Sequence, residues 1–446
     1  MKLLFILALI ALTQSSAHAD WLSLCHKQPA ASLEARNDSR LAYYFAPDES
    51  VSLLQLTKMP ADSACQQLEL SVNAEEVIWS AFASNIPLEA TTLALQGLMR
   101  DERFVVSEII PPESSSSNPP EIAQKPLESK RWSNKVTKSA WFWSPALWLQ
   151  TPEKIFNVKQ KLGINRIYIT VPSNNGAVNQ PAELRKFIAK AHTQNLQVWA
   201  VLGDKSAVTS EGVAVFLNAS AAYGAFNDES NPSERLEGLQ LDIEPYLIAG
   251  YAQDPAAWLS KYSDVVNNIH LTAPNLPIDI VVPFWFDPET PLIAKMLDEV
   301  ADSIDRITVM DYRTKPEQIR RKASPFFDWG NRYKKTIDIA LETLPMPQEE
   351  RRSYQQAQAG QLWRIHLAGK TVILLLKNAK TADAGAGVIS YSFTHTRLVD
   401  GTDISFYKDK DKDKLWALLP SLEYDFRARS SFSGLAIHGL DNGLQQ

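Results

Sequence analysis

Two carboxylates near the middle of the chain, Asp242 and Glu244, have the spacing that acid–base chemistry needs. They belong to the run Glu237-Gly238-Leu239-Gln240-Leu241-Asp242-Ile243-Glu244-Pro245, in which apolar and polar residues alternate. This alternation is typical of a β-strand with one apolar and one polar face. On such a strand the two Cα atoms lie roughly 6.5 to 7 Å apart, so ionisation of one carboxyl raises the pKa of the other. The pair therefore predicts one group that holds a proton near neutral pH beside one that does not.

A simpler interpretation of the pair is a strand end that binds a cation or is merely solvated. The context favours chemistry, because the last three hundred or so residues repeat a strand followed by a helix. We expect strands over 141–143, 166–171, 197–202, 237–244, 278–285, 306–312, 336–342 and 434–439. The helices are expected over 152–162, 181–194, 210–223, 255–269, 291–300, 316–333 and 415–426.

Eight such units predict an α/β fold, a closed (β/α)8 TIM-like barrel over 136–446, preceded by a small, β-rich N-terminal domain. An open doubly wound sheet is the main alternative. It usually carries a glycine-rich phosphate-binding turn after its first strand, whereas Trp143-Ser144-Pro145 stands there. We therefore favour the barrel.

In a barrel of this type the reactive residues lie at the C-terminal ends of the strands. Acids and aromatic residues dominate these positions, while cysteine is absent and histidine occurs once. A metal site built from several histidines is disfavoured, and we expect neither a bound metal nor a cofactor. The residues of interest at the strand ends are Trp143, Asp242, Glu244, Trp285, Asp311, Tyr312, Glu342 and His438.

Two short motifs resemble those of chitinase-like glycoside hydrolases of family 18. The carboxylate strand resembles the family pattern Asp-Gly-x-Asp-x-Asp-x-Glu, with Glu237 and Gln240 in place of its first two acids. The run Met310-Asp311-Tyr312-Arg313 is similar to the family's Met-x-Tyr-Asp, with Arg313 in place of Asp, and the family's tryptophan on the last strand is absent. The chain thus looks like a divergent member of this family or of the related glycosidase barrels.

The resemblance implies that Tyr312 supports the reacting N-acetyl group of the sugar. The residue types suit glycoside cleavage independently, since that reaction needs an acid for the leaving oxygen and a second group for the developing charge. Glu244 would be the acid, with its pKa raised by Asp242, and Asp242 would orient the N-acetyl group as internal nucleophile.

The remaining strand-end residues have more than one interpretation. Trp143, Trp148 and Trp285 could all supply flat apolar surface for sugar rings, and we assign Trp143 and Trp285 to sugar binding, although such tryptophans often cover a barrel core. Glu342 is either a further catalytic carboxylate or an ion-pair partner of Arg313. Asp311, Arg313 and His438 are assigned to substrate binding, and for His438 a structural role is the alternative.

The N-terminal part predicts export. Residues 1–19 combine Lys2, the apolar stretch 3–12 and the small residues of Ala17-His18-Ala19, as a signal peptide does. No second apolar run approaches the ~20 residues that span a bilayer. A periplasmic or secreted protein without a membrane span is expected, and the net charge of -6 argues against a nucleic-acid partner.

Residues 20–110 form the predicted β-rich accessory domain, with strands over 40–45, 51–56, 67–72, 77–82, 92–98 and 103–109. Cys25 and Cys65 would pair as a disulfide in an oxidising compartment; two unrelated buried thiols are the alternative. Residues 111–135 are expected to be a Pro/Ser-rich linker. Later in the chain, 388–393 and 402–407 suggest an inserted hairpin, and the alternating charges of 408–414 suggest a solvated loop.

Three functions compete at this point. The first is a secreted glycoside hydrolase acting on an N-acetylhexosamine-containing polysaccharide such as chitin, peptidoglycan or an exopolysaccharide. The second is a catalytically inactive carbohydrate-binding or envelope scaffold barrel, which the changes at Gln240 and Arg313 favour. The third is a barrel enzyme of another class, with Glu342 and Glu244 as nucleophile and acid. Neither the glycan nor the oligomeric state follows from the pattern.

Overall fold

The computed structural model describes residues 40–45, 52–55, 66–73, 76–82, 86–87, 89–100, 103–110, 136–251, 254–367, 370–382, 387–442 and 444. The signal peptide over 1–19, Cys25, Cys65 and the linker over 111–135 lie outside these ranges, so they stay predictions. The chain divides into two compact units. One takes in the described parts of 1–94, 109–112 and 352–395, and the other those of 95–108, 113–351 and 396–446.

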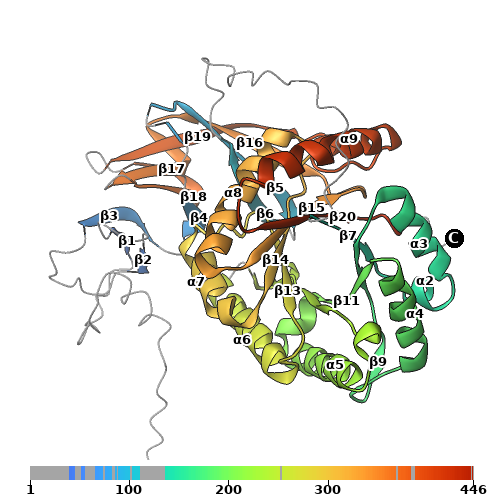
Figure 1. Ribbon diagram of the computed structural model, residues 1–446. Coiled ribbons are helices and arrows are strands. Elements are labelled where there is room, and N and C mark those ends of the chain that lie inside the picture. The colour runs from blue at the N-terminus through green and yellow to red at the C-terminus, as the bar shows by residue number, and fades with distance from the viewer. Residues whose placement is uncertain are drawn as a thin grey trace, which may run out of the picture. The chain divides into compact units, whose positions relative to one another are not determined.

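The second unit contains a closed barrel of eight parallel strands, which confirms the predicted fold class (Figure 1). The last strand pairs with the first and closes the ring. In order around the barrel the strands are β7 (Thr137–Phe142), β8 (Arg166–Ile169), β11 (Gln197–Gly203), β12 (Gly238–Asp242), β13 (Ile278–Pro283), β14 (Arg306–Met310), β15 (Thr336–Glu342) and β20 (Phe432–His438).

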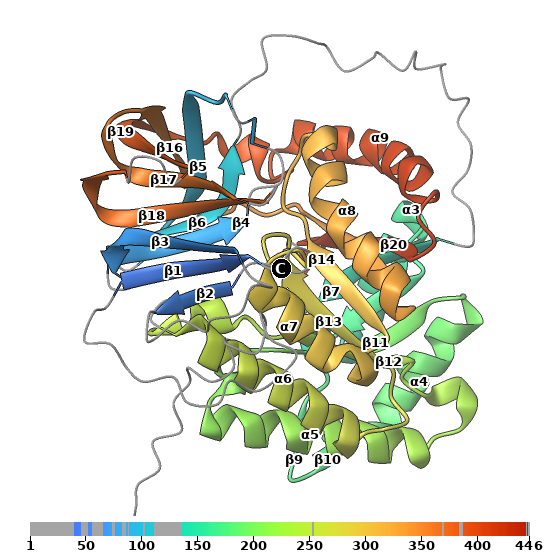
Figure 2. The same ribbon diagram turned by 90° about the vertical axis from the view of Figure 1, so that its left-hand side faces the viewer.

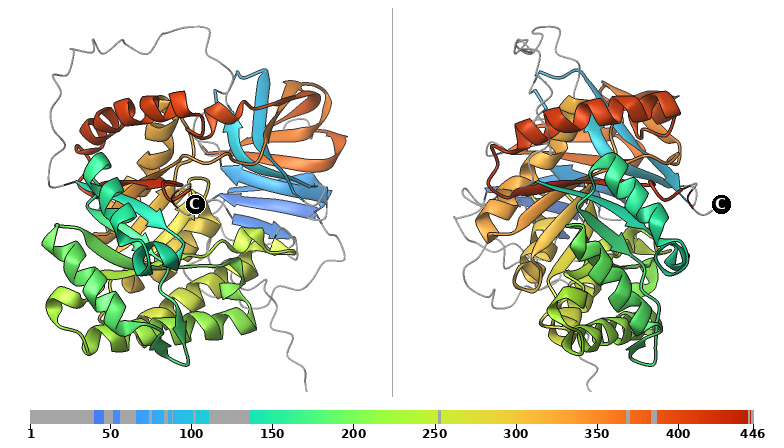
Figure 3. Two further views of the ribbon diagram at one scale, coloured as in Figure 1. Left: turned by 90° about the vertical axis from the view of Figure 1, so that its right-hand side faces the viewer. Right: turned by 45° about the vertical axis from the view of Figure 1, so that its right-hand side comes forward.

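Helices alternate with these strands and lie outside them (Figure 3). They are α2 (Pro145–Leu149), α3 (Pro152–Leu162), α4 (Pro181–Thr193), α5 (Ser210–Asp228), α6 (Pro255–Thr272), α7 (Pro291–Val300), α8 (Pro316–Tyr333) and α9 (Asp409–Phe426). Six of the eight begin with proline, which suits the first helical position because its missing N–H would have no partner there. Helices α5, α6 and α7 pack against one another in sequence order (Figure 2).

The two sides of each barrel strand have different surroundings. On β12, Leu239 and Leu241 are fully buried in the core between strands and helices. The barrel interior holds a separate cluster that includes Trp141, Tyr168 and Trp199. Gly238 makes room for it, because a Cβ at this residue would lie 2.3 Å from the Trp199 ring.

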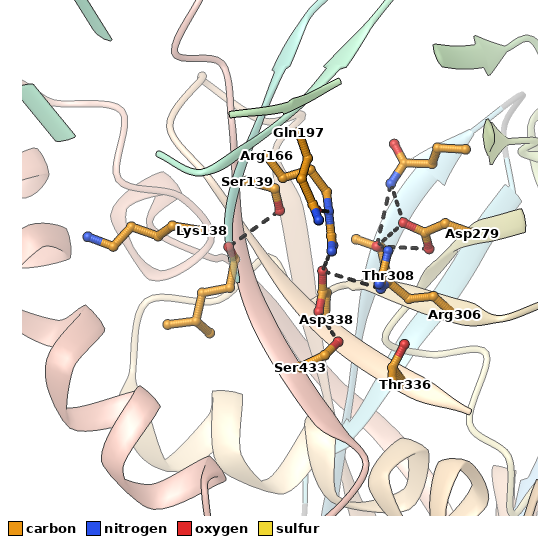
Figure 4. Close-up of polar contacts among 12 residues, drawn as sticks. Lys138, Ser139, Arg166, Gln197, Asp279, Arg306, Thr308, Thr336, Asp338 and Ser433 are labelled. Carbon is orange, nitrogen blue, oxygen red and sulfur yellow. Dashed lines mark hydrogen bonds and ion pairs between the residues drawn. The ribbon is translucent and has the colours of Figure 1, made fainter. Parts of the chain in front are cut away.

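Buried polar side chains also occupy the barrel interior (Figure 4). Asp338 pairs with Arg166 at 3.0 Å and lies 3.8 Å from Nε of Arg306. Asp279 accepts hydrogen bonds at 2.9 Å from the Tyr168 hydroxyl and the Thr308 hydroxyl. Such groups are stable in a barrel core only when they are paired.

The other strands in the described ranges belong to three sheets, the smallest of which pairs β9 (Ser173–Asn174) with β10 (Ala177–Val178). A three-stranded sheet has the order β2 (Ser52–Gln55), β1 (Arg40–Phe45), β3 (Gln66–Asn73). A seven-stranded sheet has the order β4 (Val77–Phe82), β18 (Lys370–Thr381), β17 (Ala359–Leu367), β19 (Val388–Leu398), β16 (Glu349–Gln356), β5 (Thr92–Arg100), β6 (Arg103–Ile110). All six strands predicted before residue 110 are present, and the larger sheet joins three of them to four strands from 349–398. The limits of the predicted domains stay a prediction.

Two local predictions late in the chain were wrong. The predicted strand over 402–407 is not a strand, since residues 401–403 form a 3-10 turn. The run predicted as a solvated loop starts α9 instead, because Asp409 pairs with Lys412 and Asp411 with Lys414 at helical spacing. No helix in the described ranges has the length and apolar character to cross a bilayer.

Candidate active site

Asp242 is the last residue of strand β12, and Glu244 follows it by two residues, so the strand ends before the predicted limit at 244. The apolar residues Leu239, Leu241 and Ile243 lie in the core between the strands and the helices. Asp242 and Glu244 alternate with them and are half-buried. Within the described residues, neither carboxylate belongs to an ion pair with lysine or arginine. The two acids are therefore available for proton transfer.

The electrostatic effect that the spacing predicts falls on Asp242. Burial, followed by the charge of Glu244, raises the pKa of Asp242 to about 7, and the nearby His438 opposes this shift. Its Oδ1 is buried and has no hydrogen-bond partner among the described residues. Glu244 accepts a hydrogen bond from the Tyr246 hydroxyl, a partner that the sequence analysis missed although it stands only two residues further on.

Tyr312 follows β14 and lies in the same electrostatic environment. Burial, then the charges of Glu342, Asp242 and Glu244, raises its pKa well above the ordinary value. The phenol consequently stays protonated and can donate a hydrogen bond. The charges of three residues predicted as catalytic thus act on the fourth, Tyr312.

Glu342, at the end of β15, is held by several partners and is 2% exposed. Its Oε1 accepts hydrogen bonds from the backbone N–H groups of Thr343 and Leu344, both at 2.7 Å. Its Oε2 lies 2.8 Å from Nδ1 of His438. Glu342 therefore contacts His438 and not Arg313, which pairs with Glu349.

His438 also joins Trp143 to this group. The indole N–H of Trp143 donates to Nε2 of His438 at 3.0 Å, so in this arrangement Nδ1 carries the ring proton and donates to Glu342. Burial alone would lower the pKa of His438, but the hydrogen bond and charge of Glu342 outweigh it and raise the pKa. The Trp143 contact acts in the opposite sense, because Nε2 accepts a hydrogen bond only in the neutral ring.

The two predicted sugar-binding tryptophans are both half-buried. The Trp143 ring lies against Gly203, where a Cβ would stand 3.1 Å from it, and its backbone N–H donates to Asp441 at 3.0 Å. The Trp285 ring makes edge contacts with Tyr246, at 4.6 Å between ring centres, and with Phe286 at 4.8 Å. Their part in substrate binding stays a prediction.

Asp311 and Arg313 flank Tyr312 and are buried, with 0% and 2% exposed. Burial raises the pKa of Asp311 well above its ordinary value, although Arg313 and Lys322 oppose the shift. Both carboxyl oxygens of Asp311 are without a hydrogen-bond partner in the described part of the chain. Arg313 pairs with Glu349 at 3.1 Å. Their predicted contact with substrate likewise stays a prediction.

Two aspartates of the family pattern are replaced in this chain by Gln240 and Glu237, and the structure shows what each replacement contacts. Gln240 accepts a hydrogen bond from the Trp141 indole at 2.6 Å and donates to Asp279 at 2.9 Å, inside the barrel. A carboxylate in its place would face Asp279 with like charge. Glu237 lies just before β12, where it accepts a hydrogen bond from the Val198 N–H at 2.7 Å.

In the described ranges no group of three or more His, Cys, Asp or Glu residues is arranged to hold a metal ion.

No protein-family model matches the sequence, and no curated protein matches it. Solved structures with a similar fold are family 18 chitinases and related TIM-barrel glycosidases. A GH18 chitinase from Pseudoalteromonas aurantia is 13% identical, with 69% of this chain and 96% of that chain covered and a TM-score of 0.40. The C-terminal domain of a putative chitinase from Desulfitobacterium hafniense is 12% identical, with 68% and 93% covered and a TM-score of 0.38. The Bacillus cereus spore cortex-lytic enzyme SleL is 10% identical, with 68% and 70% covered and a TM-score of 0.34. At such identities the similarity concerns the fold alone.

Proposed function

We propose that this protein is a glycoside hydrolase that acts on an N-acetylhexosamine-containing polysaccharide, with Glu244 as the proton donor. The observation that supports the proposal is the position of the three residues at strand ends, since Asp242 ends β12, Glu244 follows it by two residues and Tyr312 follows β14. The charges of Asp242 and Glu244 both act on the Tyr312 phenol. Reactive residues of TIM barrels lie at this end. Glycoside cleavage requires a carboxylic acid for the leaving oxygen and a second group that attacks or stabilises the anomeric centre.

Each of the three residues would have a distinct part. Glu244 protonates the leaving oxygen of the glycosidic bond. Asp242, whose pKa of about 7 lets it take up or release a proton near neutrality, orients the N-acetyl group of the sugar so that its oxygen attacks the anomeric carbon. The neutral Tyr312 hydroxyl donates a hydrogen bond to the same N-acetyl group. Trp143 and Trp285 would supply apolar surface for sugar rings.

We also propose that the protein is exported to the periplasm or secreted, as the leader-like residues 1–19 indicate. A polysaccharide of the cell envelope or the surroundings would then be accessible to it. Sequencing the N-terminus of the mature protein tests this proposal, because cleavage near Asp20 is expected. A mature protein that keeps Met1 would contradict it.

Release of reducing ends from chitin, peptidoglycan and an N-acetylated exopolysaccharide tests the catalytic proposal. Glu244→Gln should lower the rate by about 10²- to 10⁴-fold, the usual contribution of a general acid. Glu211→Gln is the matched control, because Glu211 is exposed at the start of α5 and should leave the rate unchanged.

Equal rates for the wild type and Glu244→Gln would remove Glu244 from the role of acid. A wild-type protein that binds one of these glycans for hours without product would instead support a carbohydrate-binding barrel. Both outcomes are read from the same preparation, provided that binding is measured alongside product release.

A further inference from the structure

Arg313, which directly follows Tyr312, is among the largest fully buried side chains in the described chain, at 2% exposure. A guanidinium does not lose its charge in proteins and has five N–H donors to satisfy. Where those donors go therefore indicates what the residue does. In the family that the sequence resembles, the residue after the tyrosine is an aspartate, so the role of this arginine belongs to this chain.

The guanidinium of Arg313 connects the backbone of Tyr312 to two carboxylates. Nη1 donates to the carbonyl oxygen of Tyr312 at 2.8 Å. Nη2 lies 3.1 Å from Oε2 of Glu349, and Nε lies 3.6 Å from Oε2 of Glu108. The guanidinium carbon also lies 4.5 Å from the centre of the Phe284 ring, within cation–π range. Strands β6 and β16, which carry Glu108 and Glu349, thus hold the chain at Tyr312.

Both carboxylates are themselves fixed. Glu349 accepts a hydrogen bond from the Gln96 amide of β5 at 2.5 Å. Glu108 pairs with Arg321 at 2.6 Å and with Lys322 at 3.1 Å, both on α8. Burial would raise the pKa of Glu108, but the charges of Lys322 and the two neighbouring arginines lower it. Glu108 is therefore ionised at neutral pH and can anchor Arg313.

Asp311 does not compete with Glu108 and Glu349 as an ionised partner of the Arg313 guanidinium. It is fully buried, and its pKa lies well above the ordinary range because of that burial. The carboxylates that pair with Arg313 are those of Glu108 and Glu349, and Glu108 pairs in addition with Arg321 and Lys322. These ion pairs link the backbone of Tyr312 to the two strands.

We propose that Arg313 is a positioning residue that fixes Tyr312 for the reaction, and that strands β6 and β16 anchor Arg313 through Glu108 and Glu349. The inference rests on the proposed function, because that function gives the Tyr312 hydroxyl a substrate group to bind. A hydroxyl that must bond an N-acetyl group tolerates little displacement, since a shift of about 1 Å in a catalytic group can cost 10²-fold in rate.

Steady-state kinetics of single and double variants test the inference. Arg313→Gln should lower kcat by about tenfold or more and change KM by less than about threefold, because binding by other residues remains. In a Tyr312→Phe background the same change should cost less than about twofold, since the residue through which it acts has lost its hydroxyl. Arg332→Gln is the matched control, because Arg332 is an exposed residue of α8 outside this cluster, and the change should leave kcat unchanged. Full additivity of Arg313→Gln and Tyr312→Phe would overturn the proposal.

Hydrogen–deuterium exchange separates this inference from the proposed function. The peptide that spans 310–315 should exchange faster in Arg313→Gln and in Glu349→Gln than in the wild type, and at the wild-type rate in the control Arg332→Gln. If Arg313→Gln does not fold, Glu349→Gln carries the same test. Unchanged exchange in the folded variant overturns the positioning role even if the wild type hydrolyses glycans. A wild type without hydrolysis overturns the proposed function, while the exchange result still decides whether Arg313 holds this segment.

Discussion

The barrel holds two groups of acids whose surroundings differ sharply. Inside it, Asp338 and Asp279 are fully buried and well partnered, by two arginines and Ser433 in one case and by Tyr168, Thr308 and Gln240 in the other. At the C-terminal end, Asp242 has a buried oxygen without a partner in the described chain, and Glu244 bonds a tyrosine hydroxyl. Burial raises the pKa of Asp279 as well as that of Asp242, so the two groups differ in the hydrogen-bond and ion-pair partners that their carboxylates have.

This difference in partners distinguishes carboxylates that stabilise the barrel from carboxylates that are available for proton transfer. A buried carboxylate that is fully paired contributes to the unique packing of the core. A carboxylate that burial and a like charge disfavour has a raised pKa and so can exchange protons near neutral pH. Mutations in the first group should therefore change the free energy of unfolding, and mutations in the second should change its pH dependence and the activity.

Arg166→Met should have the largest effect on stability. Arg166 and Asp338 are 5% and 0% exposed and lie 3.0 Å apart, so the substitution leaves a buried carboxylate with its weaker partners. Breaking such a pair costs about 3 to 5 kcal/mol of unfolding free energy, measurable by urea denaturation. Arg397→Met, at an exposed position, should stay within about 0.5 kcal/mol of the wild type. Equal stabilities of the two variants would show that the interior pair does not stabilise the barrel.

Asp242→Asn should have the next largest effect, with the opposite sign. The pKa of Asp242 is raised from 3.8 to about 7 in the fold, so the folded state binds more protons than the unfolded state between these values. The wild type therefore loses stability as the pH rises from about 4 through 7. The Asn variant lacks this loss, and at pH 8 it should be more stable than the wild type by about 1 to 4 kcal/mol, while its hydrolytic rate falls.

Thermal unfolding at pH 5 and pH 8 measures this difference. Asp264→Asn, at an exposed position of α6, is the control and should keep the wild-type pH dependence. If Asp242→Asn loses stability with pH as steeply as the wild type does, the carboxyl is not destabilised in the fold and the contrast with the interior acids fails.

Much of the barrel could be predicted because its signals are local. Proline at 152, 181, 255, 291 and 316 begins a helix in each case, and period-two runs mark the strands. The position of Asp242 and Glu244 followed from the same alternation. Pairing between distant strands is not local, and the sheet that joins 77–110 to 349–398 could not be inferred from either segment alone.

The residues of the candidate site likewise divide into those that a local signal predicts and those that it does not. Tyr312 was found because a motif marks it, but Asp311 and Arg313 alternate with it and are buried on their own account. Period-two alternation places neighbours on opposite faces, which is the signal that distinguishes them from Tyr312. The partners Glu108 and Glu349 lie more than thirty residues away in sequence and carry no motif. Tyr246 was missed because a tyrosine after a proline has no distinctive spacing.

Gln240→Glu tests the boundary between the two groups, because Gln240 lies on the same strand as Asp242. Its amide donates to Asp279 at 2.9 Å and its oxygen accepts from Trp141 at 2.6 Å. The substitution removes the donor and adds a like charge, which should cost about 1 to 3 kcal/mol of unfolding free energy. Gln180→Glu, exposed before α4, should be neutral within about 0.5 kcal/mol. A stable Gln240→Glu variant would mean that the interior accommodates an acid here, as the family pattern has it.

The variants Trp143→Phe and Trp148→Phe compare a residue at the barrel mouth with a core residue, and Trp143→Phe has the smallest expected effect on unfolding free energy in this series. Each substitution removes one indole N–H, which bonds His438 at 3.0 Å in the first case and the Thr170 carbonyl at 3.0 Å in the second. Trp148 is 3% exposed, so its loss leaves a buried acceptor unsatisfied and should cost about 1 to 3 kcal/mol. Trp143 is half-buried, water can replace its N–H, and the cost should be about 0.5 to 1.5 kcal/mol.

Ligand binding then separates the two tryptophans further. If the Trp143 ring contacts sugar, Trp143→Phe keeps an aromatic face and should weaken binding of an N-acetylglucosamine oligomer less than Trp143→Ala does, whereas Trp148→Phe should leave the affinity unchanged. Titration followed by calorimetry measures all three. Equal affinities for Trp143→Ala and the wild type would assign Trp143 to the packing of the barrel mouth, and the mouth would then differ from the interior only in its acids.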